Sequence, residues 1–291
     1  MRQRPLGSGA PNVSAIGYGG MHLSLRDRPS ESQAVAVLHA VLDAGVTLLD
    51  TADVYSLDQY DIGHNERLIA GALGSHRGAR GDVIIATKGG LVRPGGRWET
   101  DGRPEQLLAA CDRSLLALGV DRIDLYQLHA LDPRVPLEES VGAMADLQRA
   151  GKIRWVGLSN VSVEEIERAR AIVSILTVQN RLNPFFREAL SSGVVAHCAR
   201  HGIGFLAYSP TGGGRLNLKL PDHPVLAPMA QRLGASAHAI VLAWVLSKSP
   251  TVIPIPSARR VEHAVDSVGA ANLELSAGDL AAIDEAEFSR A

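Results

Sequence analysis

The sequence IDLYQLHALDPRVPLEESVGAMADLQRAGKIRWVGLSN spans residues 123–160 and contains the pattern that decides the fold. It begins with a largely apolar run at 123–128, which is typical of a strand buried on both faces. A longer amphipathic segment at 137–150 follows and ends before Gly151, where a left-handed residue often terminates a helix. A second apolar run at 153–158 completes a strand–helix–strand unit, which favours parallel strands.

The same alternation extends over the rest of the 291 residues. Strands are expected at 16–19, 47–50, 83–87, 123–128, 153–158, 175–178, 204–207 and 252–255. Helices are expected at 32–44, 65–73, 104–118, 137–150, 162–171, 189–201, 236–248 and 261–270. This α/β pattern predicts a (β/α)8 TIM barrel formed by a single domain over 1–291, with an open doubly wound sheet as the alternative. A β-hairpin at 4–13 would close the barrel bottom, and an extra C-terminal helix would occupy 277–286.

Composition indicates which classes of binding partner and which cellular compartment the sequence favours. The formal net charge of -2 does not favour nucleic acid or an anionic membrane surface as a partner. Cys111 and Cys198 lack the spacing of a disulfide framework, so we expect a reducing, cytoplasmic setting. Residues 1–12 lack the apolar core of a signal peptide, and the apolar run at 239–246 is too short to span a bilayer. The oligomeric state is left open, and a monomer is compatible with the sequence.

A pair of histidines raises the question of a metal ion. His197 and His201 lie four residues apart on a predicted helix, next to Cys198. This spacing could chelate a metal, but zinc sites use three or four ligands and no third ligand is apparent in the sequence. We therefore expect no metal.

Polar residues follow several predicted strands at their carboxyl ends. Asp50 ends the second strand with Tyr55 just beyond it, Lys88 ends the third and His129 ends the fourth. Strand ends of this kind converge on the catalytic face of a barrel. A lysine ammonium lowers the pKa of a nearby tyrosine hydroxyl, and a carboxylate keeps the lysine charged. The group suits protonation of a carbonyl oxygen as hydride reaches its carbon, although each residue alone could be structural.

These residues stand in motifs that resemble those of the aldo-keto reductases. DTADVY at 50–55 is similar to the family's DTAxxY motif, and GHNE at 63–66 is similar to its GxxE motif. ATK at 86–88, LGVDRIDLYQLH at 118–129, GLSN at 157–160 and YSP at 208–210 extend the likeness along the chain. The resemblance implies NADPH-dependent reduction of an aldehyde or ketone to an alcohol. It makes Tyr55 the general acid, assisted by Lys88, Asp50 and His129.

The resemblance also implies a site for NADPH or NADP+ on the same face. The residues that would hold the nicotinamide are Ser159, Asn160, Gln179 and Tyr208, the last by stacking on the ring. The residues that would wrap the pyrophosphate lie within 209–214 and include Ser209, Pro210, Gly212 and Gly214. No GxGxxG motif follows a predicted strand, which argues against a Rossmann cofactor site.

The adenosine end of the cofactor would lie beyond the last predicted strand. Ser257, Arg259 and Arg260 occupy the positions that bind the 2′-phosphate in the family, and guanidinium groups recognise phosphate well. This is the reason to favour NADPH over NADH. His263, Asp266 and Ser267 align with further adenosine contacts, where the family often has Gln, Glu and Asn; it often has Gly in place of Ser257.

Other interpretations keep the same fold. The chain could be a non-catalytic, cofactor-binding partner protein like the channel-associated β subunits, or a metal-dependent barrel enzyme. Narrower enzymatic interpretations are a pyridoxal reductase and a natural-product ketoreductase. The segment 91–103, which contains Trp98, could either line the pocket for a small carbonyl substrate or form a surface excursion.

Overall fold

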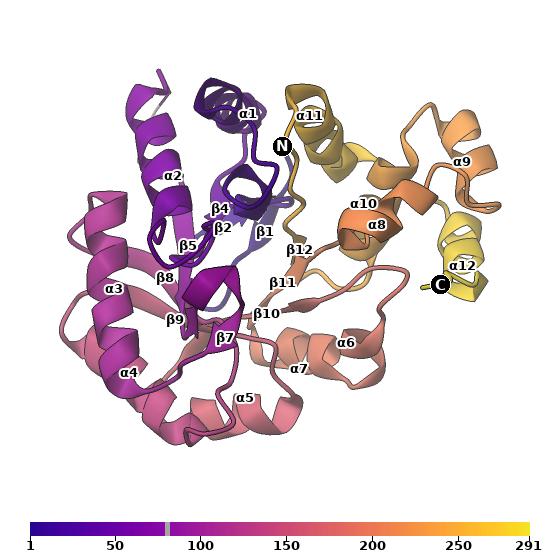
Figure 1. Cartoon of the computed structure of the whole chain (residues 1–291). Helices are drawn as coiled ribbons and strands as arrows, with labels where there is room; N and C mark the ends of the chain where they lie inside the picture. Colours follow the sequence, from indigo (N-terminus) through magenta and orange to yellow (C-terminus); the bar gives the residue numbers. More distant parts are fainter. Residues whose placement is uncertain (79–81) are drawn as a thin grey trace.

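The computed structural model describes residues 1–78 and 82–291, and its centre is a parallel eight-stranded sheet (Figure 1). Neighbouring strands follow the order β12-β11-β10-β9-β8-β5-β4-β3. Their bounds are β3 (Tyr18–Gly19), β4 (Leu48–Asp50), β5 (Ile84–Gly89), β8 (Ile123–Leu128), β9 (Ile153–Ser159), β10 (Ile175–Arg181), β11 (Gly204–Tyr208) and β12 (Val252–Pro254). All eight correspond to predicted strands, with shifts of a few residues at their ends.

The two outermost strands of this order meet along a seam. The Gly17 amide donates to the carbonyl of Pro254 at 3.0 Å, and the Gly19 amide donates to Pro256 at 2.9 Å. Both prolines lack an amide hydrogen. Their carbonyls accept hydrogen bonds from the chain at β3, but they cannot donate a hydrogen bond in return. The seam therefore lacks the reciprocal bonds of an ordinary parallel ladder. This curled, parallel sheet is consistent with the predicted (β/α)8 architecture and differs from an open sheet.

Helices surround the strands on the outside (Figure 1). They are α1 (Glu31–Asp43), α2 (His64–Ser75), α3 (Pro104–Leu118), α4 (Leu137–Arg149), α5 (Val163–Arg170), α6 (Glu188–Ser191), α7 (Val194–His201), α8 (Gly213–Leu216), α9 (Leu226–Leu233), α10 (Ala237–Ser247), α11 (Val261–Gly269) and α12 (Ala277–Glu285). The predicted helix at 189–201 is two helices, because Gly193 adopts a left-handed φ of 80° between them. Sequence patterns did not predict α8 and α9.

The interior of the sheet is filled by alternate side chains of the strands. One buried cluster contains Leu48, Ile84, Leu125, Leu206 and Ile253, all from different strands. Leu6 belongs to the same cluster and is fully buried. It follows β1 (Gln3–Pro5), which pairs with β2 (Asn12–Ser14) in the predicted N-terminal hairpin. The hairpin thus covers one end of the strands with an apolar side chain.

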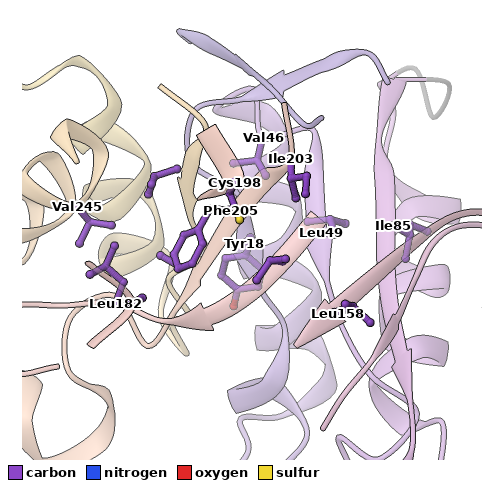
Figure 2. Close-up of a cluster of buried hydrophobic side chains, with 14 of the residues drawn as sticks. Tyr18, Val46, Leu49, Ile85, Leu158, Leu182, Cys198, Ile203, Phe205 and Val245 are labelled. Atoms are coloured by element: carbon purple, nitrogen blue, oxygen red, sulfur yellow. The ribbon is translucent and has the colours of Figure 1, made fainter. Parts of the chain in front are cut away.

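The neighbours of these residues point the other way, against the helices. Leu49, Ile85, Tyr126, Phe205 and Val252 belong to a second, larger cluster. Part of that cluster is drawn in Figure 2, which labels Phe205 of β11 and Cys198 of α7 next to each other. In the part of the chain that the structure describes, no single helix is long and apolar enough to cross a membrane; only α9 and α10, bent by 97°, meet that test as a pair.

Two-residue periodicity explains how the sheet positions a polar layer. Successive strand residues face opposite sides, so a side chain two positions after an interior leucine is also interior. Asp50 follows Leu48 in this way, and Gln127 follows Leu125. Gly157 leaves room beside this layer, because a Cβ there would lie 2.5 Å from Thr177 Oγ1 and 2.8 Å from Gln127 Cγ. Polar groups therefore lie above the apolar interior at the carboxyl ends of the strands.

Candidate active site

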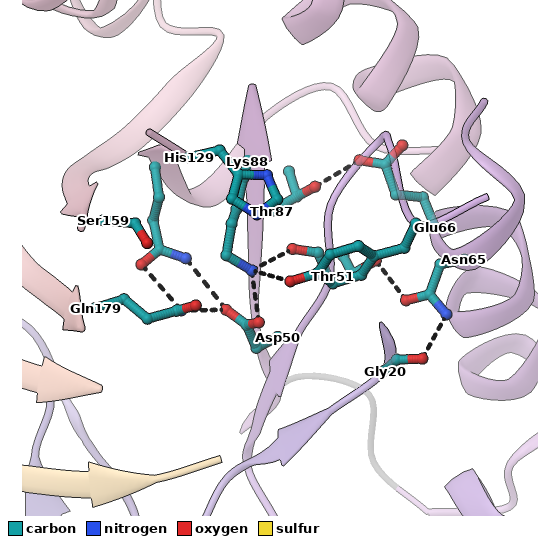
Figure 3. A network of polar contacts seen from close by, with 12 residues as sticks. Gly20, Asp50, Thr51, Asn65, Glu66, Thr87, Lys88, His129, Ser159 and Gln179 are labelled. Atoms are coloured by element: carbon teal, nitrogen blue, oxygen red, sulfur yellow. Dashed lines mark hydrogen bonds and ion pairs between the residues drawn. The ribbon is translucent and has the colours of Figure 1, made fainter. Parts of the chain in front are cut away.

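The predicted catalytic residues meet around the fully buried Lys88. Figure 3 shows Lys88 between Asp50 and His129. Its ammonium donates to Asp50 Oδ1 at 2.6 Å, to the Thr51 carbonyl at 2.8 Å and to Tyr55 Oη at 3.0 Å. An ammonium has three N–H groups, so these bonds use all of its donors. The Tyr55 oxygen accepts one of them, which leaves its own hydrogen for another acceptor.

Burial changes the acid–base properties expected from the sequence. Burial of the hydroxyl raises the pKa of Tyr55, and the opposing effect of Lys88 does not cancel it. The direction is therefore the reverse of the lowered pKa that lysine proximity alone predicts. Burial by itself lowers the pKa of Lys88, but Asp50 and Tyr55 outweigh that effect and raise it. The tyrosine is thus held protonated beside a charged lysine.

His129 follows β8 and faces the tyrosine. Its ring centroid lies 5.7 Å from that of Tyr55, with the rings nearly perpendicular. Burial, with the Lys88 charge as a second cause, holds the pKa of His129 well below its usual value. Its Nδ1 is buried and has no hydrogen-bond partner among the described residues. A neutral imidazole with a free ring nitrogen can orient a substrate oxygen by a hydrogen bond.

The loop after β5 covers this group from the outside. It contains the hairpin of β6 (Leu91–Val92) and β7 (Glu99–Thr100). The centroid of the Trp98 ring lies 6.4 Å from the ring centroids of both Tyr55 and His129. The Arg93 guanidinium lies 4.0 Å from the centroid of the Trp98 ring. The structure therefore places this segment over the tyrosine and the histidine.

Two glutamine side chains converge on the second oxygen of Asp50. Gln179 Nε2 donates to Oδ2 at 2.6 Å, and Gln127 Nε2 donates to it at 3.2 Å. The sequence assigned Gln179 to the nicotinamide and gave Gln127 no role. The signal that could have identified Gln127 is its place two positions before His129, on the face of the strand that also carries the interior Leu125. Together with Lys88, the glutamines hold both oxygens of the carboxylate.

The residues expected at the nicotinamide lie next to this network. Asn160 adopts a left-handed φ of 60°, and its Nδ2 donates to Ser159 Oγ at 3.1 Å and to the His129 carbonyl at 3.0 Å. The Tyr208 hydroxyl donates to Asn160 Oδ1 at 2.8 Å. Ser159, Asn160 and Tyr208 therefore form a connected row from the histidine to the end of β11.

The segment after β11 has the backbone of a tight cradle. Ser209 has a φ of 47°, and Gly212 has a φ of 99° just before α8. A Cβ on Gly212 would lie 3.0 Å from the Phe185 ring and from Leu216, so this position needs a glycine. Pro210 and Gly214 lie on either side of it in the sequence. The sequence-based expectation that 209–214 wraps the pyrophosphate remains a prediction.

The residues expected at the adenosine end lie between β12 and the end of α11. Ser257 Oγ is buried without a hydrogen-bond partner among the described residues. Arg259 and Arg260 are exposed at the start of α11, and Arg259 Nη1 donates to the Asp27 carbonyl at 2.8 Å. Asp266 Oδ2 accepts from Ser236 at 2.6 Å, which turns this carboxylate toward α10. His263 is exposed and Ser267 is half-buried on the same helix.

Two buried carboxyl groups lie behind the site and had no assigned role. Glu66 Oε1 accepts from Thr87 Oγ1 at 2.6 Å. Neither oxygen of Asp53 has a hydrogen-bond partner among the described residues, and the nearest cationic group is Arg113 at 3.9 Å. Burial and the neighbouring Glu66 raise the pKa of Asp53 well above its ordinary value. A sequence does not reveal that these two acids meet.

Comparison with known proteins identifies the family of this chain. The family model described as "Aldo/keto reductase family" matches residues 15–287. The chain belongs to the aldo/keto reductase family. An uncharacterized oxidoreductase of Schizosaccharomyces pombe is 34% identical over 278 residues, covering 94% of this chain and 86% of that protein. The resemblance drawn from the motifs of this family member is thereby confirmed.

Solved structures of aldo/keto reductases have the same fold. An aldo/keto reductase from Klebsiella pneumoniae in complex with NADP and acetate superposes with a TM-score of 0.81 at 29% identity, covering 98% of this chain and 95% of that one. The glycerol dehydrogenase AKR11B4 from Gluconobacter oxydans superposes with a TM-score of 0.85 at 25% identity, covering 97% and 94%. The family assignment therefore extends over nearly the whole of this aldo/keto reductase chain.

Proposed function

We propose that the protein reduces a small aldehyde or ketone to an alcohol with NADPH, with Tyr55 as the general acid. The observation that carries this proposal is the saturated Lys88 ammonium. Because its three donors are used on Asp50, Thr51 and Tyr55, the tyrosine hydrogen is free for a substrate oxygen. The raised pKa of Tyr55 keeps that hydrogen in place until the carbonyl oxygen gains charge.

The proton step follows from these contacts. A bound nicotinamide supplies the hydride that adds to the carbonyl carbon. As charge develops on the carbonyl oxygen, Tyr55 transfers its proton to that oxygen and keeps the electron pair of the broken O–H bond. The Lys88 N–H group stabilises the resulting phenolate, because it already points at the oxygen at 3.0 Å. Neutral His129 hydrogen-bonds the carbonyl oxygen and sets its angle.

The residues of the cofactor series fit NADP(H). A polar row of Ser159, Asn160 and Tyr208 lies next to the acid, and Gly212 adds no side chain to the segment that would wrap the pyrophosphate. We place the 2′-phosphate near the exposed Arg259 and Arg260, with the orphaned Ser257 hydroxyl close by in the chain. His263, Asp266 and Ser267 would complete the adenosine end. The relative from K. pneumoniae binds NADP, which supports this choice.

We further propose that the substrate is a small carbonyl compound bound under Trp98. A pyridoxal-type aldehyde and a natural-product ketone suit such an aromatic cover, because flat or apolar substrates pack against an indole. The glycerol dehydrogenase among the relatives supports testing the alcohol in the reverse direction. We propose that the chain acts as one catalytic domain in the cytoplasm, and the two buried thiols are compatible with that setting.

The decisive experiment follows NADPH oxidation with a panel of aldehydes and ketones. Tyr55→Phe removes the proton donor and should lower kcat by about 10²- to 10⁴-fold while leaving the Kd for NADPH nearly unchanged. Tyr60→Phe is the matched control, since Tyr60 lies in the same loop but is 89% exposed. Full activity of Tyr55→Phe would contradict the assigned mechanism. Tight NADPH binding without turnover on any substrate would instead favour a non-catalytic binding protein.

A further inference from the structure

A second cluster of ionisable side chains lies outside the active site, between α5 and α7. Glu167 on α5 and the pair His197 and His201 on α7 each offer one ligand atom, and these atoms lie within 4.8 Å of one another. The sequence presents the histidines as a pair without a third ligand. The packing of α5 beside α7 supplies that ligand, which is why it could not be found from spacing along one helix.

We propose that Glu167, His197 and His201 bind a divalent transition-metal ion, with Zn²⁺ as the best match to the ligand set. Two imidazoles and one carboxylate are a common set for tetrahedral zinc, with the fourth position open to water. Such a site would join two neighbouring helices. It is separate from the carbonyl chemistry proposed above.

The state of His197 points to a missing ligand. Its side chain is only 5% exposed, and its Nε2 lies 2.9 Å from Glu167 Oε1 without the alignment of a good hydrogen bond. A buried polar atom without a partner normally costs stability, so it needs an explanation. The His197 and His201 rings lie 4.4 Å apart, so a nitrogen of each can reach a shared ion. A metal ion would accept a lone pair from both rings.

The local charges are compatible with a cation. Glu167 also accepts a hydrogen bond from Arg170, and both of its contacts involve Oε1. Its Oε2 makes no hydrogen bond with the residues that the structure describes. His201 is the last residue of α7, where the negative end of the helix dipole favours positive charge. Arg170 would have to share or release the carboxylate when the ion binds.

The geometry requires only side-chain adjustment. Ligand atoms of a tetrahedral zinc ion lie about 3.3 Å apart, given bonds of about 2.0–2.1 Å. The carboxylate–imidazole distance of 2.9 Å is already close to this value. Glu167 and His201 are exposed, so their side chains can turn toward the buried His197. The remaining separations, up to 4.8 Å, would have to close by rotation of these side chains.

The position of the cluster predicts what the ion does. α5 and α7 end just before β10 and β11 begin, whereas the catalytic residues lie at the opposite, carboxyl ends of the strands. The residue after His201, Gly202, accepts a hydrogen bond at 2.7 Å from Ser8 in the N-terminal hairpin. An ion at this end would stabilise the packing of α5, α7 and the hairpin. It would leave the reduction step unchanged.

The test uses untagged full-length protein freed of metal with a chelator that is then removed. Titration with Zn²⁺ against a chromophoric chelator should give one site per chain, and saturating Zn²⁺ should raise the Tm by about 5 °C. Co²⁺ should give the visible absorption bands of a tetrahedral ion. No binding, or no change in Tm together with six-coordinate Co²⁺ spectra, would overturn the proposal.

Variants locate the ion. Glu167→Gln and His201→Gln alter exposed ligands and should each weaken Zn²⁺ binding at least about tenfold, since losing one of three ligands removes much of the affinity. Glu164→Gln is the matched control, because it makes the same change on the same helix outside the cluster. Equal affinity of Glu167→Gln and Glu164→Gln would disprove this site. Failure of the carbonyl reduction assay would not bear on these binding measurements.

Discussion

Three hydrogen bonds from one buried ammonium determine how the side chains at the ends of β4 and β5 are arranged. The sequence predicted that Asp50, Tyr55 and Lys88 would meet, because each follows or ends a strand and the strand ends converge. It could not predict the net pKa of Tyr55. That value depends on how completely the packed chain excludes water from the hydroxyl, which no local pattern contains.

The buried Asp53 carboxyl makes the stability of the folded protein depend on pH. Because its pKa is raised in the folded state, the native protein keeps a proton that the unfolded chain loses as pH rises above about 4. The native state then binds more protons, so stability falls with increasing pH in this window. Asp53→Asn cannot ionise and gives up no hydrogen bond, since neither carboxyl oxygen has a partner among the described residues.

We therefore expect the stability of Asp53→Asn relative to wild type to increase with pH. Urea unfolding at pH 5 and at pH 8 should show the difference growing by on the order of 1 kcal/mol. Asp121→Asn, at an exposed position, is the control and should show no such trend. A difference that stayed constant or shrank between the two pH values would mean that Asp53 is ionised in the folded protein.

For individual helices and strands, the predictions were reliable where a short stretch of sequence contains the whole signal. Ser162 and Glu165 form a capping box at the start of α5, which fits the helix expected from residue 162. The break at Gly193 was missed because the amphipathic pattern continues from α6 into α7. The short helices α8 and α9 were missed because they lie in a connection whose sequence contains turn residues as well as apolar ones.

The loop that contains β6 and β7 gives the prediction that belongs to this scale. Trp98 is 46% exposed, so shortening it removes only part of the buried area of a core tryptophan, and its ring faces Tyr55 and His129. Trp98→Ala should raise KM for the carbonyl substrate by roughly tenfold, as expected for losing 1–2 kcal/mol of contact. The Tm should change little.

Steady-state kinetics measure kcat and KM for both Trp98→Ala and Tyr60→Ala. Tyr60 is an exposed aromatic residue in the preceding loop, so Tyr60→Ala controls for the loss of a surface ring. If Trp98→Ala lowered kcat without changing KM, the indole would act on the reacting geometry and not on substrate binding. If neither constant changed, the loop would not line the substrate pocket.

For the whole molecule, the alternation of strands and helices was enough to predict the parallel sheet and its polar end. Contacts between distant segments were not predictable. Three contacts all depend on how elements pack: the Glu167 carboxylate beside His197, Gln127 paired with Asp50, and Asp53 near Glu66. In each case the two residues lie in different segments of the fold, so no helix or strand periodicity in the sequence connects them.

The seam between the first and last strands has a consequence for motion. Pro254 and Pro256 accept hydrogen bonds from Gly17 and Gly19 but return none, so this line holds the sheet together less firmly than the ladders elsewhere. In native-state hydrogen–deuterium exchange, the Gly17 and Gly19 amides should exchange faster than the amide of Leu125 within the central strand β8. Since Ser257 follows this seam directly, cofactor bound at the adenosine end should slow the exchange of both glycines. Exchange as slow as that of Leu125 without cofactor would show that the seam is no weaker than the rest of the sheet.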